Sequence, residues 1–174
     1  MRPALAVSLA AATLLAACSN MGMPAGPTAT ATLGPTLGNA ASGTVYFTQK
    51  GDRVLVSGEV RGLPPNSEHG FHVHEKGDCS SSDAMSAGGH FNPGNQQHGR
   101  YDMAAHHAGD IPSLRADASG VAAINFETTS LRVGSGANDV VGRAVVVHRD
   151  KDDYMSQPAG NSGPRVACGV VQRS

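Results

Sequence analysis

This sequence of 174 residues lacks the features that define several large classes of protein. Its N-terminal apolar run, residues 4–17, is too short and too rich in alanine for a membrane-spanning helix. Beyond that run, no stretch carries a convincing helical period. The basic excess typical of nucleic-acid-binding proteins is also missing, because 13 basic residues stand against 14 acidic ones. These absences argue against a membrane-spanning, helical or nucleic-acid-binding protein.

The sequence is notable instead for its eight histidines. In Gly70-Phe-His-Val-His-Glu75, an extended strand would place His72 and His74 on one face and Phe71 and Val73 on the other. Such a pair also occurs among ordinary surface histidines, so a metal site is indicated only if the sequence has further potential ligands. The other potential ligands are His90, His98, His107, Asp110 and His148. Six imidazoles and one carboxylate suit borderline ions such as copper and zinc rather than calcium or magnesium.

Alternating apolar and polar residues predict several strands. They fall at residues 44–50, 53–60, 121–128, 143–149 and 165–171, and clusters of Gly, Pro, Asn and Asp separate them. The fold class is therefore all-β, an antiparallel sandwich or flattened barrel. Two glycine-rich intervals, residues 76–119 and 150–164, interrupt the strands, and loops of this length in a small domain are usually functional. The first interval contains four of the seven potential ligands.

Five segments, taken in order, resemble the signature segments of copper,zinc superoxide dismutases. They are Gly70-Phe-His-Val-His-Glu75, Gly88-Gly-His-Phe-Asn-Pro93, His107-Ala-Gly-Asp110, Val146-Val-His148 and Gly163-Pro-Arg-Val-Ala-Cys-Gly169. The resemblance covers roughly residues 43–174. It implies an eight-stranded antiparallel Greek-key barrel with two long functional loops. It also implies dismutation of superoxide anion to O2 and hydrogen peroxide by a redox-cycling copper beside a structural zinc.

The same resemblance assigns a role to each site residue. One copper per subunit would be bound by His72, His74, His90 and His148, and one zinc by His90, His98, His107 and Asp110. His90 would act catalytically, as a bridging imidazolate that also carries a proton. Arg165 would attract superoxide to the copper, and Asp152 would hydrogen-bond a copper ligand and a zinc ligand. Cys79 and Cys168 would form a disulfide.

Three of these assignments have alternatives. His106 is a rival for the zinc position, but only His107 fits the family's His-x-Gly-Asp, so we expect His106 to be a solvated loop residue. In the same strand, His69 would lie on the core-facing side with Phe71. We therefore expect His69 to be a hydrogen-bonded structural histidine. Asp152 could instead be one charge of an acidic run with Asp150 and Asp153.

The N-terminal region predicts export and lipidation. Residues 1–17 resemble a signal peptide, and Leu15-Ala-Ala-Cys18 resembles a bacterial lipobox. Three cysteines leave one without a partner, and lipidation would use Cys18; the alternative is a plain signal peptide with a free thiol nearby. Residues 18–41, rich in Ala, Thr, Gly and Pro and without charge, predict a linker that would span about 25 Å as a coil and up to about 75 Å when extended. Residues 42–174 would form the superoxide dismutase domain.

The expected location is the periplasmic side of a bacterial membrane, where lipidated Cys18 would hold the protein at the membrane surface. Ser19 after the cysteine favours the outer membrane by analogy with enteric sorting. The partners expected are superoxide and that membrane surface, without nucleic acid. Residues 151–164 look bacterial and lack the acidic-plus-lysine cluster that steers superoxide in the animal cytosolic branch, so Arg165 is the one steering residue that the resemblance identifies. A homodimer and a monomer both fit, because the dimer interface differs between the branches.

Two other functions fit parts of the pattern. A copper- and zinc-binding lipoprotein without turnover could use the same ligands, but it would not need Arg165, and the sequence has no methionine-rich or Cys-x-x-Cys copper-transfer motif. A zinc hydratase could use His72, His74 and His148 with an open position. That hypothesis leaves the other four ligands unexplained.

Overall fold

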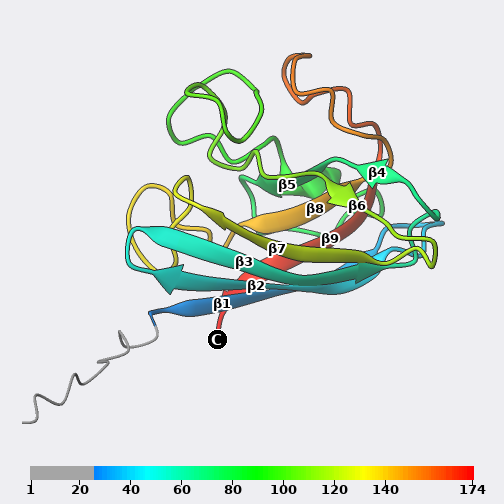
Figure 1. Cartoon of the computed structure of the whole chain (residues 1–174), viewed down its shortest axis with the longest axis horizontal. Coiled ribbons are helices and arrows are strands. Elements are labelled where there is room, and N and C mark those ends of the chain that lie inside the picture. Colours follow the sequence, from blue (N-terminus) through cyan, green and yellow to red (C-terminus); the bar gives the residue numbers. More distant parts are fainter. Residues whose placement is uncertain (1–25) are drawn as a thin grey trace, which may run out of the picture.

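A computed structural model describes residues 26–174. Seven strands form one antiparallel sheet, in the order β5-β8-β9-β1-β2-β3-β7, which curls into a half-barrel (Figure 1). They are β1 (Thr28–Pro35), β2 (Ser42–Lys50), β3 (Arg53–Arg61), β5 (Phe71–His74), β7 (Ala122–Thr128), β8 (Ala144–His148) and β9 (Arg165–Arg173). β4 (Glu68–His69) and β6 (Leu114–Arg115) pair separately. The prediction of an antiparallel all-β fold is confirmed, with nine strands of varied length in the described residues rather than eight.

The chain crosses between the two ends of the sheet. After the β2–β3 hairpin it passes to β5, returns to β7 beside β3, and crosses again to β8 and β9. The crossing from β5 to β7 runs through the first interval predicted as a loop, residues 76–119, and the second, residues 150–164, joins the adjacent strands β8 and β9. In Figure 1 these loops, green and orange, rise from the same side of the sheet near β5 and β8.

The N-terminal strand corrects the predicted linker. β1 lies between β2 and β9 and pairs with both. Alternation explains its position, because Ala29, Ala31 and Leu33 are buried in the core while the intervening threonines lie on the other face. The linker prediction is thus wrong for residues 28–35. Residues 1–25, including the predicted signal peptide and Cys18, lie outside the described residues.

One main hydrophobic core fills the concave side of the sheet. Val45 and Phe47 of β2, Val54 and Val56 of β3, and Val145 of β8 are fully buried in it. A smaller cluster on the other face of β8 contains Ala84, Ala87, Ala144, Val146 and Cys168. Because both faces of β8 are covered, it is buried throughout, and its first four residues are apolar rather than alternating.

The first long interval contains some regular structure. It includes the 3-10 helix η1 (Met85–Ala87) and β6, and isolated bridges join His74 to His90 and His72 to Asp110. Phe91 N–H donates to the Val73 carbonyl at 2.8 Å, and Val73 N–H donates to the Gly109 carbonyl at 3.0 Å. The interval is therefore fastened along β5. Among residues 26–174, no helix has the length and apolar character to cross a membrane.

Candidate metal centre

Two neighbouring strands supply the first three imidazoles. His72 and His74 lie on β5, and His148 ends β8, which pairs with β5. Both faces of β5 are buried, so Phe71 and Val73 enter the core while the histidines lie under the loops. Period-two geometry thus produces the pair that the sequence predicted.

The first set of ligands consists of four buried imidazoles. Ligand nitrogens of His72, His74, His90 and His148 all lie within 4.8 Å of one another. His74 Nδ1–H donates to the Gly88 carbonyl at 3.0 Å, and His148 Nδ1–H donates to the Gly163 carbonyl at 3.1 Å. Each ring then presents an Nε2 lone pair, and these two nitrogens lie 3.3 Å apart. Two facing lone pairs are stabilised by a cation between them.

Two further buried nitrogens complete this set. His72 Nδ1 and His90 Nε2 have no hydrogen-bond partner among the described residues. An unpaired buried polar atom is unfavourable, and a metal ion would satisfy both. The arrangement therefore fits one ion bound by four imidazole nitrogens.

The second set surrounds one carboxylate. Asp110 Oδ1 lies 2.8 Å from His90 Nδ1, 3.0 Å from His98 Nδ1 and 3.3 Å from His107 Nδ1. The other oxygen of Asp110 accepts the N–H groups of Gly99 and His107, at 3.1 and 2.8 Å, which fixes the carboxylate. Three imidazoles and a carboxylate, all buried, are a donor set typical of zinc.

His90 belongs to both sets. Its Nδ1 faces Asp110, and its unpaired Nε2 is directed to the first set. The ring of His90 also lies 4.0 Å from that of His72 and 5.3 Å from that of His107, measured between centroids. One imidazole therefore connects the two candidate ion positions.

Asp152 makes a second connection between the two ligand sets, through hydrogen bonds to His72 and His98. His72 Nε2–H donates to its Oδ2 at 2.7 Å, and His98 Nε2–H donates to its Oδ1 at 3.0 Å. These bonds leave the Nδ1 atoms of both rings available as ligands. Asp152 is 4% exposed, which excludes the alternative of a solvated charge in an acidic run.

Burial sets the protonation of these groups. Desolvation, followed by the charges of neighbouring imidazoles, lowers the pKa of His148 to about 3 and that of His90 to about 4. His74 is affected in the same way, and its pKa lies well below the ordinary value. These rings are neutral at pH 7, the form that binds metal.

The pKa values of Asp110 and His98 are shifted by the hydrogen bonds between carboxylates and imidazoles. Burial alone would raise the pKa of Asp110, but hydrogen bonds with three imidazoles lower it below the usual range. Burial would likewise lower the pKa of His98, but hydrogen bonds with Asp110 and Asp152 outweigh it and raise this pKa to about 9. In the absence of metal, His98 therefore holds the proton that compensates the carboxylates.

Residues 41–171 match the family model described as copper/zinc superoxide dismutase. The chain belongs to this family. The chain is also similar to a solved structure of the clock protein EA4, with 38% sequence identity and a TM-score of 0.77. That similarity covers 87% of this chain and 97% of the other. As in a copper/zinc superoxide dismutase, the two sets of buried ligands are compatible with copper and zinc.

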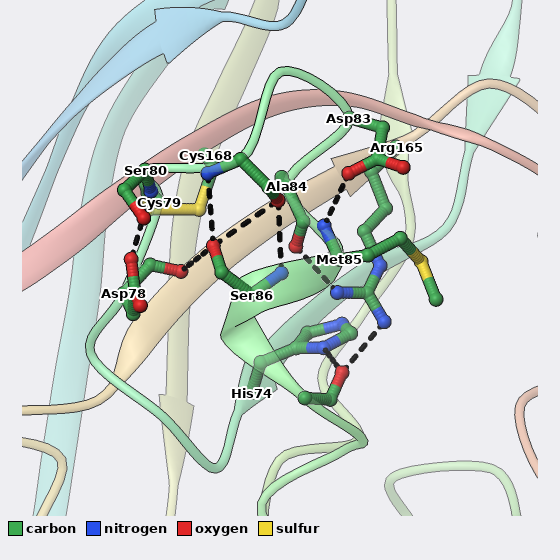
Figure 2. The surroundings of a disulfide bond; sticks show 12 residues. His74, Asp78, Cys79, Ser80, Asp83, Ala84, Met85, Ser86, Arg165 and Cys168 are labelled. Carbon is green, nitrogen blue, oxygen red and sulfur yellow. Dashed lines mark hydrogen bonds between the residues drawn. A yellow bond between two sulfur atoms is a disulfide. The ribbon is translucent and has the colours of Figure 1, made fainter.

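Arg165 lies beside the first set in this superoxide dismutase family member. Its guanidinium donates to the carbonyls of Ala84 and Gly88, both at 2.6 Å (Figure 2). Burial lowers the pKa of Arg165, although guanidinium stays charged in proteins. The positive group is therefore held in a fixed position next to His74.

The disulfide fastens the same region. Cys79 and Cys168 are bonded, which confirms the predicted pair and joins the loop before η1 to β9 (Figure 2). The bond closes a loop of 89 residues. In the chain-entropy treatment, such closure contributes about 4 to 5 kcal/mol at most to the free energy of unfolding.

Neither His106 nor His69 belongs to a ligand set, but only His69 is placed as predicted. His106 is absent from both ligand sets, and its ring contacts the His107 carbonyl and Ser130. It is half-buried rather than fully solvated. His69 is buried, donates from Nδ1 to the His148 carbonyl at 2.8 Å, and pairs with Ser67 through Nε2 at 2.6 Å.

Three contributors were missed by sequence reasoning. Gly88 provides the carbonyl shared by His74 and Arg165. Tyr154 donates its N–H to Asp152 at 2.7 Å and is anchored by its hydroxyl to Ser113 at 2.8 Å. Gln157 binds the backbone of His98. Each of their contacts with the site residues has a backbone group on at least one side, and such contacts leave no pattern of residue types in the sequence.

Proposed function

We propose that this protein dismutes superoxide to O2 and hydrogen peroxide. The observation that carries the proposal is the position of His90, whose two ring nitrogens belong to two separate sets of buried ligands. A site that only stores metal has no need of an imidazole common to two ions. The family membership supports the same reaction.

The donor sets suggest which ion each position takes. The first set, four imidazoles, would hold copper, and the second, three imidazoles and Asp110, would hold zinc. When bound, copper supplies one-electron redox chemistry, and zinc supplies none. Each subunit would thus bind one ion of each kind.

The residues of the chain would handle the proton and the substrate. Reduction of superoxide to peroxide consumes protons, and Nε2 of His90, one of the two unpaired imidazole nitrogens, is positioned to hold one. Asp110 keeps the opposite nitrogen of this ring fixed at 2.8 Å. His90 would therefore present its proton in a constant direction.

Arg165 would bind the anion. Its guanidinium shares the Gly88 carbonyl with His74, a member of the first set, so it stands next to the place where superoxide must react. The protein without residues 1–17 has a formal charge of about −2. A local positive group consequently matters more for attracting superoxide than the net charge does.

A second candidate is a metal-binding protein without turnover. It is favoured by the similarity to a protein named for a clock rather than for an enzyme. One experiment separates the two candidates: loading the purified protein with copper and zinc, measuring metal content, and following superoxide by pulse radiolysis. Rapid catalytic loss of superoxide supports dismutation, whereas full metal occupancy without turnover would establish the second candidate.

We also propose that the protein is exported and anchored by lipid on Cys18 to the periplasmic side of a bacterial membrane. The lipobox-like sequence and the odd cysteine support this proposal. Because β1 begins at Thr28, the ten residue steps from Cys18 reach at most about 35 Å, less than half of the extended length expected from a longer linker. The domain would therefore lie close to the membrane surface.

A further inference from the structure

His98 is the ligand whose backbone is held by a distant side chain. It lies in a stretch without regular secondary structure, and neither its N–H nor its carbonyl is paired with another backbone group of residues 26–174. Instead, His98 N–H donates to Gln157 Oε1 at 2.9 Å, and Gln157 Nε2 donates to the His98 carbonyl at 2.9 Å. One planar amide thus satisfies both peptide groups, as a neighbouring strand would.

The same loop also orients the ring of His98. Asp152, five residues before Gln157, accepts His98 Nε2–H at 3.0 Å. Gly160 packs so closely that a Cβ there would overlap Asp152 Oδ1 and lie 2.7 Å from His98 Nε2. With backbone and Nε2 both fixed, His98 Nδ1 can point only to Asp110 Oδ1, 3.0 Å away.

We propose that Gln157 is a positioning residue of the second ligand set, which it serves by holding the backbone of His98. The proposal rests on the metal centre put forward as the proposed function, and it concerns how tightly a divalent cation is retained there. Ligands must be held within about half an ångström of their binding geometry, and losing an outer hydrogen-bond partner of a ligand typically costs about 10- to 100-fold in metal affinity.

Gln157 is well suited to a test because its side chain is exposed while His98 is buried. Its replacement removes both hydrogen bonds to His98 and a longer one, 3.5 Å, to the Met155 carbonyl, without opening a cavity in the core, and water can reach the vacated position. The isosteric change Gln157→Met removes the donor and the acceptor together. Gln97→Met is the matched control, since Gln97 is also exposed, adjoins His98, and makes no side-chain hydrogen bond within the described residues.

The experiment uses cobalt(II) as the probe, because its visible spectrum reports coordination geometry. The full chain is freed of metal and titrated with cobalt in competition with a chelator, and the band lost in His107→Ala identifies the second set. We expect about tenfold weaker cobalt binding in Gln157→Met, with an altered band, and wild-type behaviour in Gln97→Met. Gln157→Glu, which can accept from His98 N–H but cannot donate to its carbonyl, should also bind more weakly than wild type.

Two results would overturn the proposal: wild-type affinity and band shape in Gln157→Met, or an equal loss in Gln97→Met. Wild-type protein that shows no band dependent on His107 would overturn both this proposal and the metal centre. A normal cobalt band in one preparation, together with no superoxide turnover in protein loaded with copper and zinc, would contradict dismutation alone. The role of Gln157 would still be decided by the cobalt affinity of its variants.

Discussion

His74 and Arg165 donate hydrogen bonds to the same oxygen atom, the carbonyl of Gly88, at 3.0 and 2.6 Å (Figure 2). One side chain belongs to the first ligand set and the other is the nearby cation. A displacement of Gly88 would therefore move both. The ring of His74 and the guanidinium of Arg165 are thus held in fixed relative positions by a single carbonyl oxygen.

Replacing the guanidinium should slow encounter with superoxide without removing metal. We expect Arg165→Ala to retain both ions and to lose about tenfold in rate, the low end of electrostatic steering, for which this family is a well-known example. Pulse radiolysis at several salt concentrations checks this, because the Debye length, over which charges are screened, falls from about 10 Å at 0.1 M to about 3 Å at 1 M. The wild-type rate should fall with salt, and that of the variant should change less.

Arg53→Ala is the control for this measurement, since Arg53 is exposed on β3 and pairs with Glu127 at 3.9 Å. It should behave as wild type. Equal rates and equal salt slopes in wild type and Arg165→Ala would show that attraction of the anion comes from elsewhere, with Lys151 the next residue to replace.

Removing the shared imidazole should affect both ions. We expect His90→Ala to weaken copper and zinc binding together, each by more than the roughly tenfold loss of an outer hydrogen-bond partner, and to abolish turnover. His148→Ala should weaken copper while zinc stays bound, because His148 belongs to the first set alone. Metal analysis after dialysis distinguishes the two variants. Full occupancy and activity in His90→Ala would refute the assignment.

The metal-free protein should lose stability as the pH falls from about 6.5 to 4. The folded pKa values of His148 and His90, about 3 and about 4, lie below the ordinary 6.5, so the unfolded chain binds protons first and is favoured by acid in this window. His98 acts oppositely: its raised pKa of about 9 gives a contribution that is complete below 6.5 and lost as the pH rises through 9.

Urea unfolding of the metal-free protein at pH 5, 7 and 9 measures this dependence. The midpoint should be lower at pH 5 than at pH 7. In His148→Gln the decline toward acid should be shallower, because one of the responsible imidazoles is gone. A midpoint that does not change between pH 7 and pH 5 would contradict the proposed protonation states.

If Cys18 is lipidated as proposed, its substitution should release the protein from the membrane. We expect Cys18→Ser to give soluble or unprocessed protein with an unchanged metal site, because Cys18 precedes β1 by ten residues. Cell fractionation with radioactive palmitate labelling tests this. Wild-type protein that is unlabelled and wholly soluble would exclude the lipid anchor.

Much of the sheet could be predicted from the sequence, because half-buried strands show period-two alternation. Residues 53–60, for example, correspond closely to β3 (Arg53–Arg61). β1 was missed although it alternates as well, because its inward residues are mostly alanine, which contrasts little with threonine in hydropathy. The composition of these residues therefore did not predict a strand. Their pairing with β2 on one side and β9 on the other explains why such small residues form one.

The candidate ligands could be named from the sequence, because five segments, taken in order, resemble those of one family. Their supporting contacts could not. The link between Gln157 and His98 spans 59 residues and joins an amide to a peptide group, a contact available to any backbone. Such contacts are determined by how two loops meet, which no local pattern encodes.

The position of β1 also determines how the protein would respond to a pull on its N-terminus. A strand at the edge of a sheet is peeled away one hydrogen bond at a time. β1, by contrast, is bonded along its length to β2 on one side and to β9 on the other. If the proposed lipid anchor exists, a pull directed along this strand would load both rows of bonds together in shear. β9 also carries Arg165 and Cys168, so the tether would be joined mechanically to the strand that bears the disulfide and the cation of the site.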